Sequence, residues 1–129
     1  MSDTSDLEDF ISTLYHALRA ARRRHVIQLL KKADNQRLTT RELARKIAGV
    51  ELGVPERQAT GEPYRNAYNA LSQTHLPTLS DAGIIIYDSQ RQVIRPAVNF
   101  ELAALLIDTN TPTVHVFSAF VEQSDENEE

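Results

Sequence analysis

Four side chains that can read nucleic-acid bases recur at helical spacing between residues 65 and 73. They are Arg65, Asn66, Asn69 and Gln73, and on a helix they fall on the side opposite the apolar residues. Asn and Gln can each make two hydrogen bonds to adenine, and Arg can do the same with guanine. The alternative is an ordinary polar helix surface. A hairpin pattern that follows this segment favours base recognition.

Other arginines are predicted to contact the nucleic-acid backbone. Arg91 and Arg95 lie on the hairpin, where they would meet phosphates or the minor groove, although they could equally be isolated surface cations. Arg41 and Arg45 lie on the exposed side of the preceding helix, where we expect phosphate contacts.

Three consecutive arginines, Arg22, Arg23 and Arg24, open a further helix and point in nearly every direction around it. At least one is therefore expected to make an internal ion pair. One or two of them, with Arg22 and Arg23 as candidates, are expected to touch the backbone of a nucleic acid.

The sequence offers no convincing catalytic or metal-binding set. His75 lies on the apolar side of its helix, so a hydrogen-bonded core histidine is favoured over a ligand or a pH switch. His16, His25 and His115 lack zinc-site spacing. No phosphate-binding glycine loop, nucleophile motif or catalytic carboxylate pair is present. We therefore expect no enzyme activity, no metal, no cofactor and no small-molecule ligand.

The elements that must position these side chains form a helix, a glycine and a hairpin. Helical periodicity runs from Pro63 to Ala82, with a kink or restart expected at Pro77, and Gly83 follows as a C-cap. Residues 84–87 and 93–95 are short β-branched strands around a polar turn at 88–92. This order is typical of a winged helix-turn-helix, in which the hairpin is the wing.

The preceding segments fit the same fold. Helical patterns cover residues 6–18 and about 20–33, and residues 37–39 are expected to form a strand that pairs with the wing. Thr39 and Glu42 form a capping box that begins another helix, and Gly49 is expected to end it. The 14-residue segment 49–62 is longer than a compact helix-turn-helix turn.

After the wing, residues 98–107 suggest a nearly all-apolar helix that needs a partner on more than one side. Residues 111–121 fit either a helix or a strand, with helix slightly favoured. The predicted organisation is a disordered N-terminus (1–5), a winged domain (6–96), a dimerisation segment (97–121) and an acidic disordered tail (122–129).

Composition and charge narrow the class of protein. A chain of 129 residues with 41% hydrophobic residues suits one domain, and the absence of cysteine excludes disulfides and thiolate metal sites. No membrane-spanning run or secretory signal is visible, so we expect a cytoplasmic protein without membrane contacts. The net charge is −4, yet all 14 basic residues lie between Arg19 and Arg95, a span whose seven acidic residues leave +7. A basic middle between acidic ends favours a nucleic-acid partner over an ordinary solvated surface.

The sequence also resembles known winged-helix proteins over about residues 10–96. Residues 14–18 and 22–30 are similar to the first two helices of small winged-helix regulators, and 43–47 to the helix before their turn. Residues 71–84 more closely resemble a family of small winged-helix proteins common in halophilic archaea, through His75-Leu76-Pro77, Leu79 and Ala82-Gly83. The resemblance implies a DNA-binding transcription regulator and a comparable insert before this helix.

The sequence therefore predicts an α+β, mainly helical, winged helix-turn-helix with a two-stranded wing and an additional C-terminal helix. The predicted function is sequence-specific binding of double-stranded DNA as a homodimer, with residues 63–82 in the major groove and 84–95 on the backbone or minor groove. The alternative is a winged-helix module that makes only protein contacts.

Overall fold

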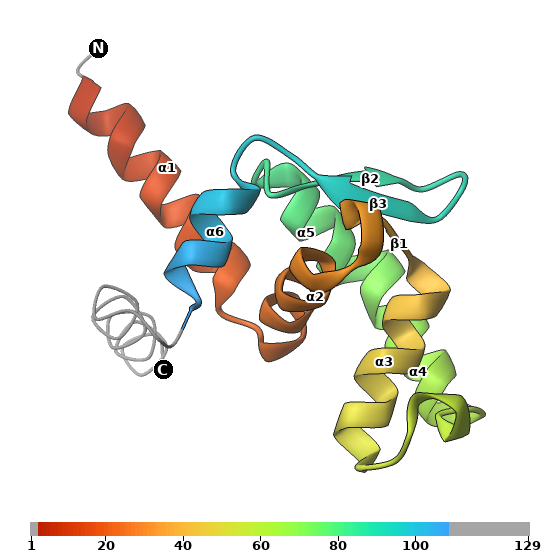
Figure 1. Ribbon diagram of the computed structural model, residues 1–129. Helices are drawn as coiled ribbons and strands as arrows, with labels where there is room; N and C mark the ends of the chain where they lie inside the picture. Colours follow the sequence, from red (N-terminus) through yellow and green to blue (C-terminus); the bar gives the residue numbers. More distant parts are fainter. Residues whose placement is uncertain (1–2, 109–129) are drawn as a thin grey trace.

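The computed structural model describes residues 3–108, and it is a mainly helical α+β fold with one small sheet (Figure 1). The helices are α1 (Asp3–Leu18), α2 (Ala21–Lys32), α3 (Thr40–Leu52), α4 (Glu62–Ala70), α5 (Leu76–Asp81) and α6 (Phe100–Leu106). The strands are β1 (Leu38–Thr39), β2 (Ile85–Asp88) and β3 (Val93–Pro96). The predicted α+β class, with mainly helical content, is confirmed. Residues 111–121 and 122–129 lie outside the described residues.

The three strands form an antiparallel sheet in the order β1-β3-β2. Leu38 pairs with Ile94 and Tyr87 also pairs with Ile94, so these side chains share the face that packs on the core. The other face carries Ile86 and Arg95, which pair with each other and are exposed. The predicted hairpin is confirmed, and of the strand predicted at residues 37–39, Leu38 and Thr39 pair with it.

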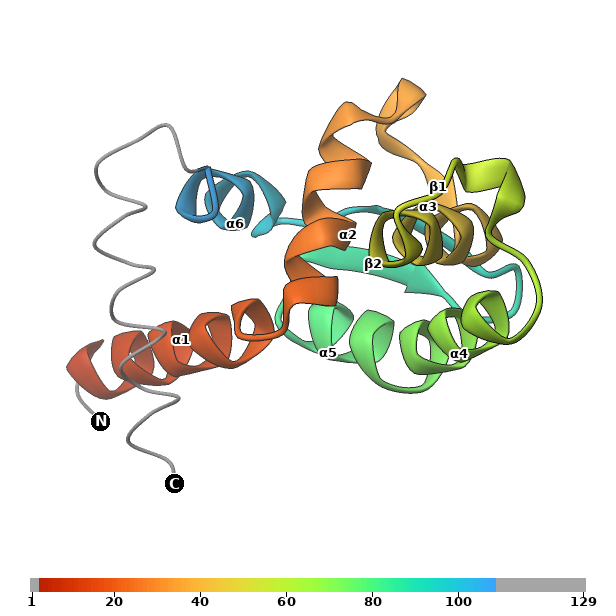
Figure 2. The same cartoon turned by 90° about the horizontal axis from the view of Figure 1, so that it is seen from below.

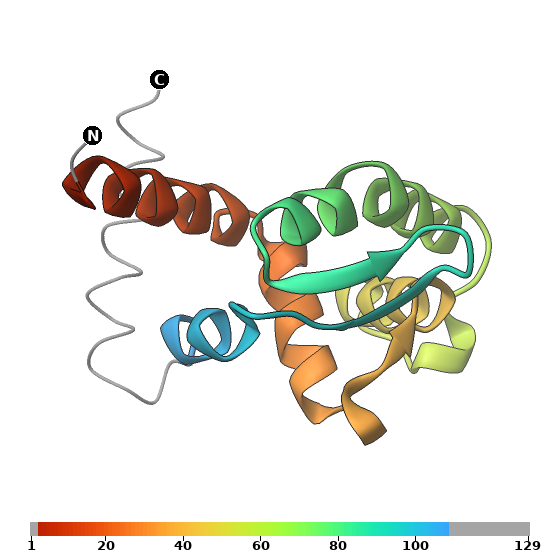
Figure 3. The same ribbon diagram turned by 90° about the horizontal axis from the view of Figure 1, so that it is seen from above.

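The hydrophobic core lies between this sheet and the helices. Its fully buried side chains come from all six α-helices and both long strands, and they include Leu18, Ile27, Leu43, Ile85 and Phe100. The hairpin extends over the helices, with α4 and α5 along one side and α2 and α3 along the other (Figure 3). Removing this apolar surface from water is the main stabilising contribution to the fold.

The helix α1 is only half covered by the rest of the molecule. It begins at Asp3, earlier than the predicted start near residue 6. Leu14 and Leu18 are buried, whereas the N-terminal half of α1 projects away from the body of the molecule (Figure 2). No helix among residues 3–108 is long and apolar enough to cross a membrane.

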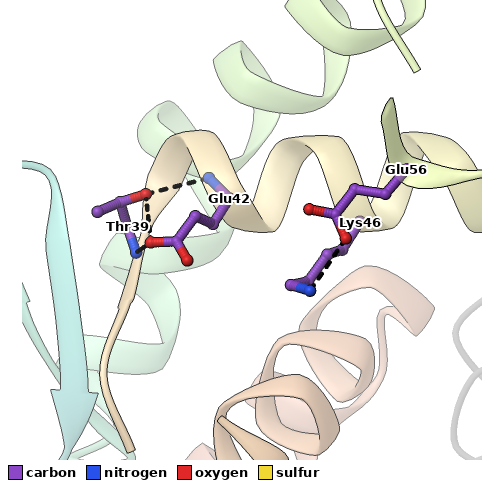
Figure 4. Close-up of polar contacts among 4 residues, drawn as sticks. All are labelled: Thr39, Glu42, Lys46 and Glu56. Atoms are coloured by element: carbon purple, nitrogen blue, oxygen red, sulfur yellow. Dashed lines mark hydrogen bonds and ion pairs between the residues drawn. The ribbon is translucent and has the colours of Figure 1, made fainter. Parts of the chain in front are cut away.

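The start of α3 matches the predicted capping box. The Thr39 hydroxyl accepts a bond from the backbone N–H of Glu42 at 3.1 Å, and the Glu42 carboxylate accepts one from the backbone N–H of Thr39 at 3.1 Å (Figure 4). These bonds satisfy two donors that the first turn of a helix leaves without intrahelical partners.

The predicted end of α3 at Gly49 is wrong. The helix continues to Leu52, and Gly53, with φ 69°, ends it in the left-handed region. Gly49 is buried inside the helix, where a Cβ would lie 3.1 Å from the carbonyl oxygen of Val54 and 3.3 Å from Cα of Glu56. Glycine at 49 therefore allows close packing inside the helix, and a larger residue would need the backbone of Val54 and Glu56 to shift. The connection to α4 shortens to residues 53–61, and an ion pair of 3.0 Å between Lys46 and Glu56 ties it to α3 (Figure 4).

The long helical pattern from residue 63 to 82 is interrupted, as Pro77 predicts. Residues Leu71–His75 form a π-helical turn between α4 and α5. Pro77 has no N–H to donate to the carbonyl of Gln73, and in a regular α-helix its ring would clash with that carbonyl, so a wider turn before it relieves the clash. Gly83, with φ 72°, follows α5 at the predicted C-cap.

Candidate functional site

The exposed face of α4 and of the π-helical turn carries the predicted base-reading residues. Arg65, Asn66, Asn69 and Gln73 are all exposed, while Ala67 and Leu71 face the core. Within residues 3–108, the side chains of these four residues make no hydrogen bond or ion pair. Their amide and guanidinium groups are therefore available to an external ligand.

The helix α3 lies against α4 and brings two more predicted residues beside it. Arg41 and Arg45 are exposed and lie one turn apart on α3. The guanidinium carbon of Arg45 is 5.9 Å from the centroid of the Tyr64 ring of α4, which is a cation–π distance. The rings of Tyr64 and Tyr68 are 6.1 Å apart at 46° and extend this contact along α4. This contact holds Arg45 between α3 and α4, and Arg45 forms no ion pair with an acidic residue among residues 3–108.

The hairpin presents the remaining two predicted cations. The Asp88 carboxylate accepts bonds of 3.1 Å from the backbone N–H groups of Gln90 and Arg91, which fixes the turn. The Arg91 guanidinium is 3.7 Å from Asp88, and its side chain is 83% exposed, so the pair is weak. Arg95 is exposed on the outer face of the sheet.

A buried polar contact joins the hairpin to the start of α3. The Thr40 hydroxyl donates to Oε1 of Gln92 at 2.7 Å, and the Tyr87 hydroxyl donates to the same oxygen at 3.0 Å. The backbone N–H of Thr40 also donates to the carbonyl of Gln92 at 3.0 Å. Arg41 and Arg91, the sequence neighbours of this pair, are consequently brought to the same end of the molecule. Sequence reasoning missed this contact, although the predicted pairing of residues 37–39 with the hairpin implied a close approach.

Arg22 and Arg23, predicted as nucleic-acid contacts, are used inside the protein. Arg22 of α2 donates twice to the Glu51 carboxylate of α3, at 2.8 Å each, and this contact raises the pKa of Arg22 and lowers that of Glu51. This is the internal ion pair that the arginine run predicted. Arg23 is 7% exposed and donates to the carbonyls of Ala17 and His16 at 2.7 and 2.9 Å. Arg23 therefore closes the C-terminal end of α1, and we leave both arginines out of the interface.

His75 is the half-buried, hydrogen-bonded histidine that the sequence favoured. Its Nδ1 lies 3.3 Å from Nη1 of Arg23. Burial and the charges of Arg23 and Arg22 lower the pKa of His75, against a smaller opposing effect of Glu51. The neutral imidazole can accept from the guanidinium, whereas the protonated ring cannot. Among the described residues no group of three His, Asp or Glu side chains could hold a metal ion.

Comparison with known proteins gives one match. Residues 15–95, from within α1 to within β3, match the model of a protein family described as a domain of unknown function, DUF7344. No curated protein and no solved structure matches the chain.

Proposed function

The chain belongs to the DUF7344 family, since that family's model spans more than half of it, and we propose that it is a sequence-specific DNA-binding regulator of winged helix-turn-helix type. The observation that carries the proposal is the set of exposed arginine and amide side chains on α4, α3 and the hairpin, of which only Arg91 has an ion pair, a weak one, within residues 3–108. Exposed arginine and amide side chains that gather on one surface are the groups by which proteins contact the phosphates and base edges of a nucleic acid.

In this proposal α4 and the π-helical turn lie in the major groove. Asn69 and Gln73 are spaced by one helical turn and read bases by paired hydrogen bonds, with Arg65 and Asn66 beside them. Arg41 and Arg45 of α3 contact phosphates and set the register of the helix on the duplex. The cation–π contact with Tyr64 orders the Arg45 side chain before binding, which lowers the entropy lost on binding.

The β2–β3 hairpin is the wing, and Arg91 and Arg95 contact the backbone or the minor groove. The bonds between Thr40 and Gln92 support this assignment because they hold the wing at a fixed angle to α3. A rigid pair of elements can meet two parts of one duplex at once without a further ordering cost.

A specific observation favours a second candidate function, a winged-helix module for protein contacts alone. Val50 and Leu52, at the end of α3, are 64% and 49% exposed. Val50 lines a hollow together with Leu29, Gly53, Val54 and Pro55. A small apolar patch of this kind is suited to a protein partner.

We further propose that the protein acts as a homodimer through α1 and α6. Leu7, Phe10 and Ile11 are exposed on one stripe of α1, and Leu102 and Leu105 are exposed on α6. Both helices pack against α2, so the two apolar surfaces belong to the same end of the molecule. A second copy that covers them would place two reading helices on a pseudo-palindromic site. Coverage by residues 109–121 of the same chain is the alternative outcome.

The proposed DNA binding is tested by titrating the full-length protein into a labelled duplex of random sequence at several salt concentrations. We expect measurable affinity near 50 mM salt that falls as a power of the salt concentration, with an exponent of about −0.9 per phosphate contacted. A protein with no affinity for any duplex at low salt would leave the protein-contact module as the better explanation.

A further inference from the structure

The outer face of the three-stranded sheet carries a basic hollow that includes one arginine not considered above. Its lining residues are Arg37, Ile86, Asp88, Arg91, Val93 and Arg95. Arg37 precedes β1, Arg91 lies in the hairpin turn and Arg95 lies on β3, so three segments each contribute one guanidinium.

The strand register, continued one residue before β1, indicates that two of these arginines lie opposite each other. Leu38 pairs with Ile94 and Thr39 with Val93, so one further step in the same antiparallel register brings Arg37 opposite Arg95. The backbone of Arg37 is extended, with φ −141° and ψ 132°, as this step requires. Like charges opposite each other on neighbouring strands destabilise a sheet. Folding therefore does not explain this pair.

No acid within residues 3–108 neutralises the pair. Neither Arg37 nor Arg95 makes an ion pair or a side-chain hydrogen bond with any of these residues. The single carboxylate of the hollow, Asp88, is 3.7 Å from Arg91 and spends one oxygen on two backbone N–H groups of the turn. The hollow therefore has three guanidinium groups and a single carboxylate, and that carboxylate already accepts two backbone hydrogen bonds from the turn.

We propose that this hollow binds a phosphate group between Arg37 and Arg95, with Arg91 at its edge. Guanidinium groups match phosphate oxygens with paired, charge-assisted hydrogen bonds, and a bound phosphate removes the repulsion between the two opposed cations. Exposed Ile86 and half-buried Val93 give the hollow an apolar floor that suits the sugar next to a backbone phosphate. The assignment of that phosphate to the DNA backbone rests on the proposed function, whereas the site itself does not.

The test compares Arg37→Gln with wild type, and Arg57→Gln serves as the control. Arg57 is an exposed arginine in the connection 53–61, which lies at the far end of the molecule from the hairpin (Figure 1). Each variant removes one charge. The two measurements are the shift in Tm that inorganic tripolyphosphate causes, relative to sodium chloride of equal ionic strength, and the salt dependence of binding to a random duplex.

Tripolyphosphate should raise the Tm of wild type and of R57Q by several degrees at concentrations well above its Kd, and raise that of R37Q far less. The slope of log affinity for the duplex against log salt concentration should be smaller in magnitude in R37Q, by about 0.9 for each protein chain bound. If tripolyphosphate distinguishes R37Q from wild type but no duplex binds, the hollow serves small phosphate compounds and the proposed DNA binding fails. If R37Q equals wild type in both measurements while wild type binds duplex DNA, the phosphate site is refuted and the proposed function stands.

Discussion

Thr40 and Gln92 are 52 residues apart in the sequence, and their side chains meet through a 2.7 Å hydrogen bond. Thr40 is fully buried, and Gln92 adopts φ 55°, a left-handed conformation that is uncommon for a residue other than glycine. The contact therefore fixes the turn of the hairpin relative to the first turn of α3. The two elements can act as one rigid surface because of it.

Removing this hydrogen bond should weaken the fold and loosen the hairpin. Thr40→Val keeps the side-chain shape but deletes the donor, so the free energy of unfolding should fall by about 0.5–1.5 kcal/mol in urea denaturation. Thr78→Val is the matched control, because the Thr78 hydroxyl only bonds back to the carbonyl of Thr74 in its own helical segment, at 2.7 Å. Equal hydrogen-exchange protection of the hairpin amides in T40V and wild type would contradict the anchoring role.

Gly49→Ala should destabilise the protein although alanine is the better helix former. The added methyl would lie 3.1–3.3 Å from backbone atoms of Val54 and Glu56. Those atoms are held in place by the 3.0 Å bond from the N–H of Val54 to the carbonyl of Gly49 and by the Lys46–Glu56 ion pair. Overpacking costs about 1–3 kcal/mol, whereas the gain in helix propensity is at most about 1 kcal/mol. A G49A variant more stable than wild type in thermal unfolding would show that the connection can move away freely.

The protein should lose stability in acid through His75. Its pKa in the folded state lies below the unfolded value of about 6.5, so the unfolded chain takes up the proton first as pH falls. The contribution of His75 to the free energy of unfolding is fully present at pH values above the unfolded pKa. It is lost as the pH falls from the unfolded pKa toward the lower folded pKa. His75→Gln retains an acceptor for Arg23 without titrating, so its free energy of unfolding should depend less on pH as the pH falls below about 6.5. An unchanged pH dependence in H75Q would exclude this histidine as the cause.

The proposed homodimer predicts twice the 14.5 kDa chain mass in light scattering at micromolar concentration. Ile11→Glu and Leu105→Glu should each shift the protein toward monomer without unfolding it, because these side chains are 40% and 50% exposed. Val50→Glu, on the exposed end of α3, is the control and should leave the mass unchanged. A wild-type mass of one chain would indicate that no second copy covers α1 and α6.

The elements that were predictable from the sequence are those with local signals. The capping box of Thr39 and Glu42 marked the start of α3, Gly83 marked the end of α5, and Pro77 marked the interruption before it. Short runs of β-branched residues on either side of a polar turn located β2 and β3.

The errors arose where tertiary contacts decide the outcome. In the sequence, a glycine that ends a helix looks the same as a glycine that packs closely inside one. Only the contacts of Gly49 with the connection 53–61 show that it belongs to the second kind. The partners of Arg22 and Arg23 could not be identified from the sequence, because Glu51 and the carbonyls at the end of α1 belong to other elements, and whether either arginine also contacts a nucleic acid stays a prediction. Arg37 was within reach of sequence reasoning, since the predicted pairing of residues 37–39 with the hairpin already implied its register.

In the proposed function, the exposed face of α4 and the π-helical turn reads the sequence of DNA. The most direct measurement is the ratio of affinities for the preferred duplex and a random duplex, in wild type and in a double variant, Asn69→Ala with Gln73→Ala. Both side chains are exposed, so the variant should fold with a loss of at most about 0.5 kcal/mol per site. We predict that discrimination falls by about 1–3 kcal/mol for each lost paired contact, while binding to the random duplex is nearly unchanged. A folded double variant that keeps the wild-type ratio would contradict the claim.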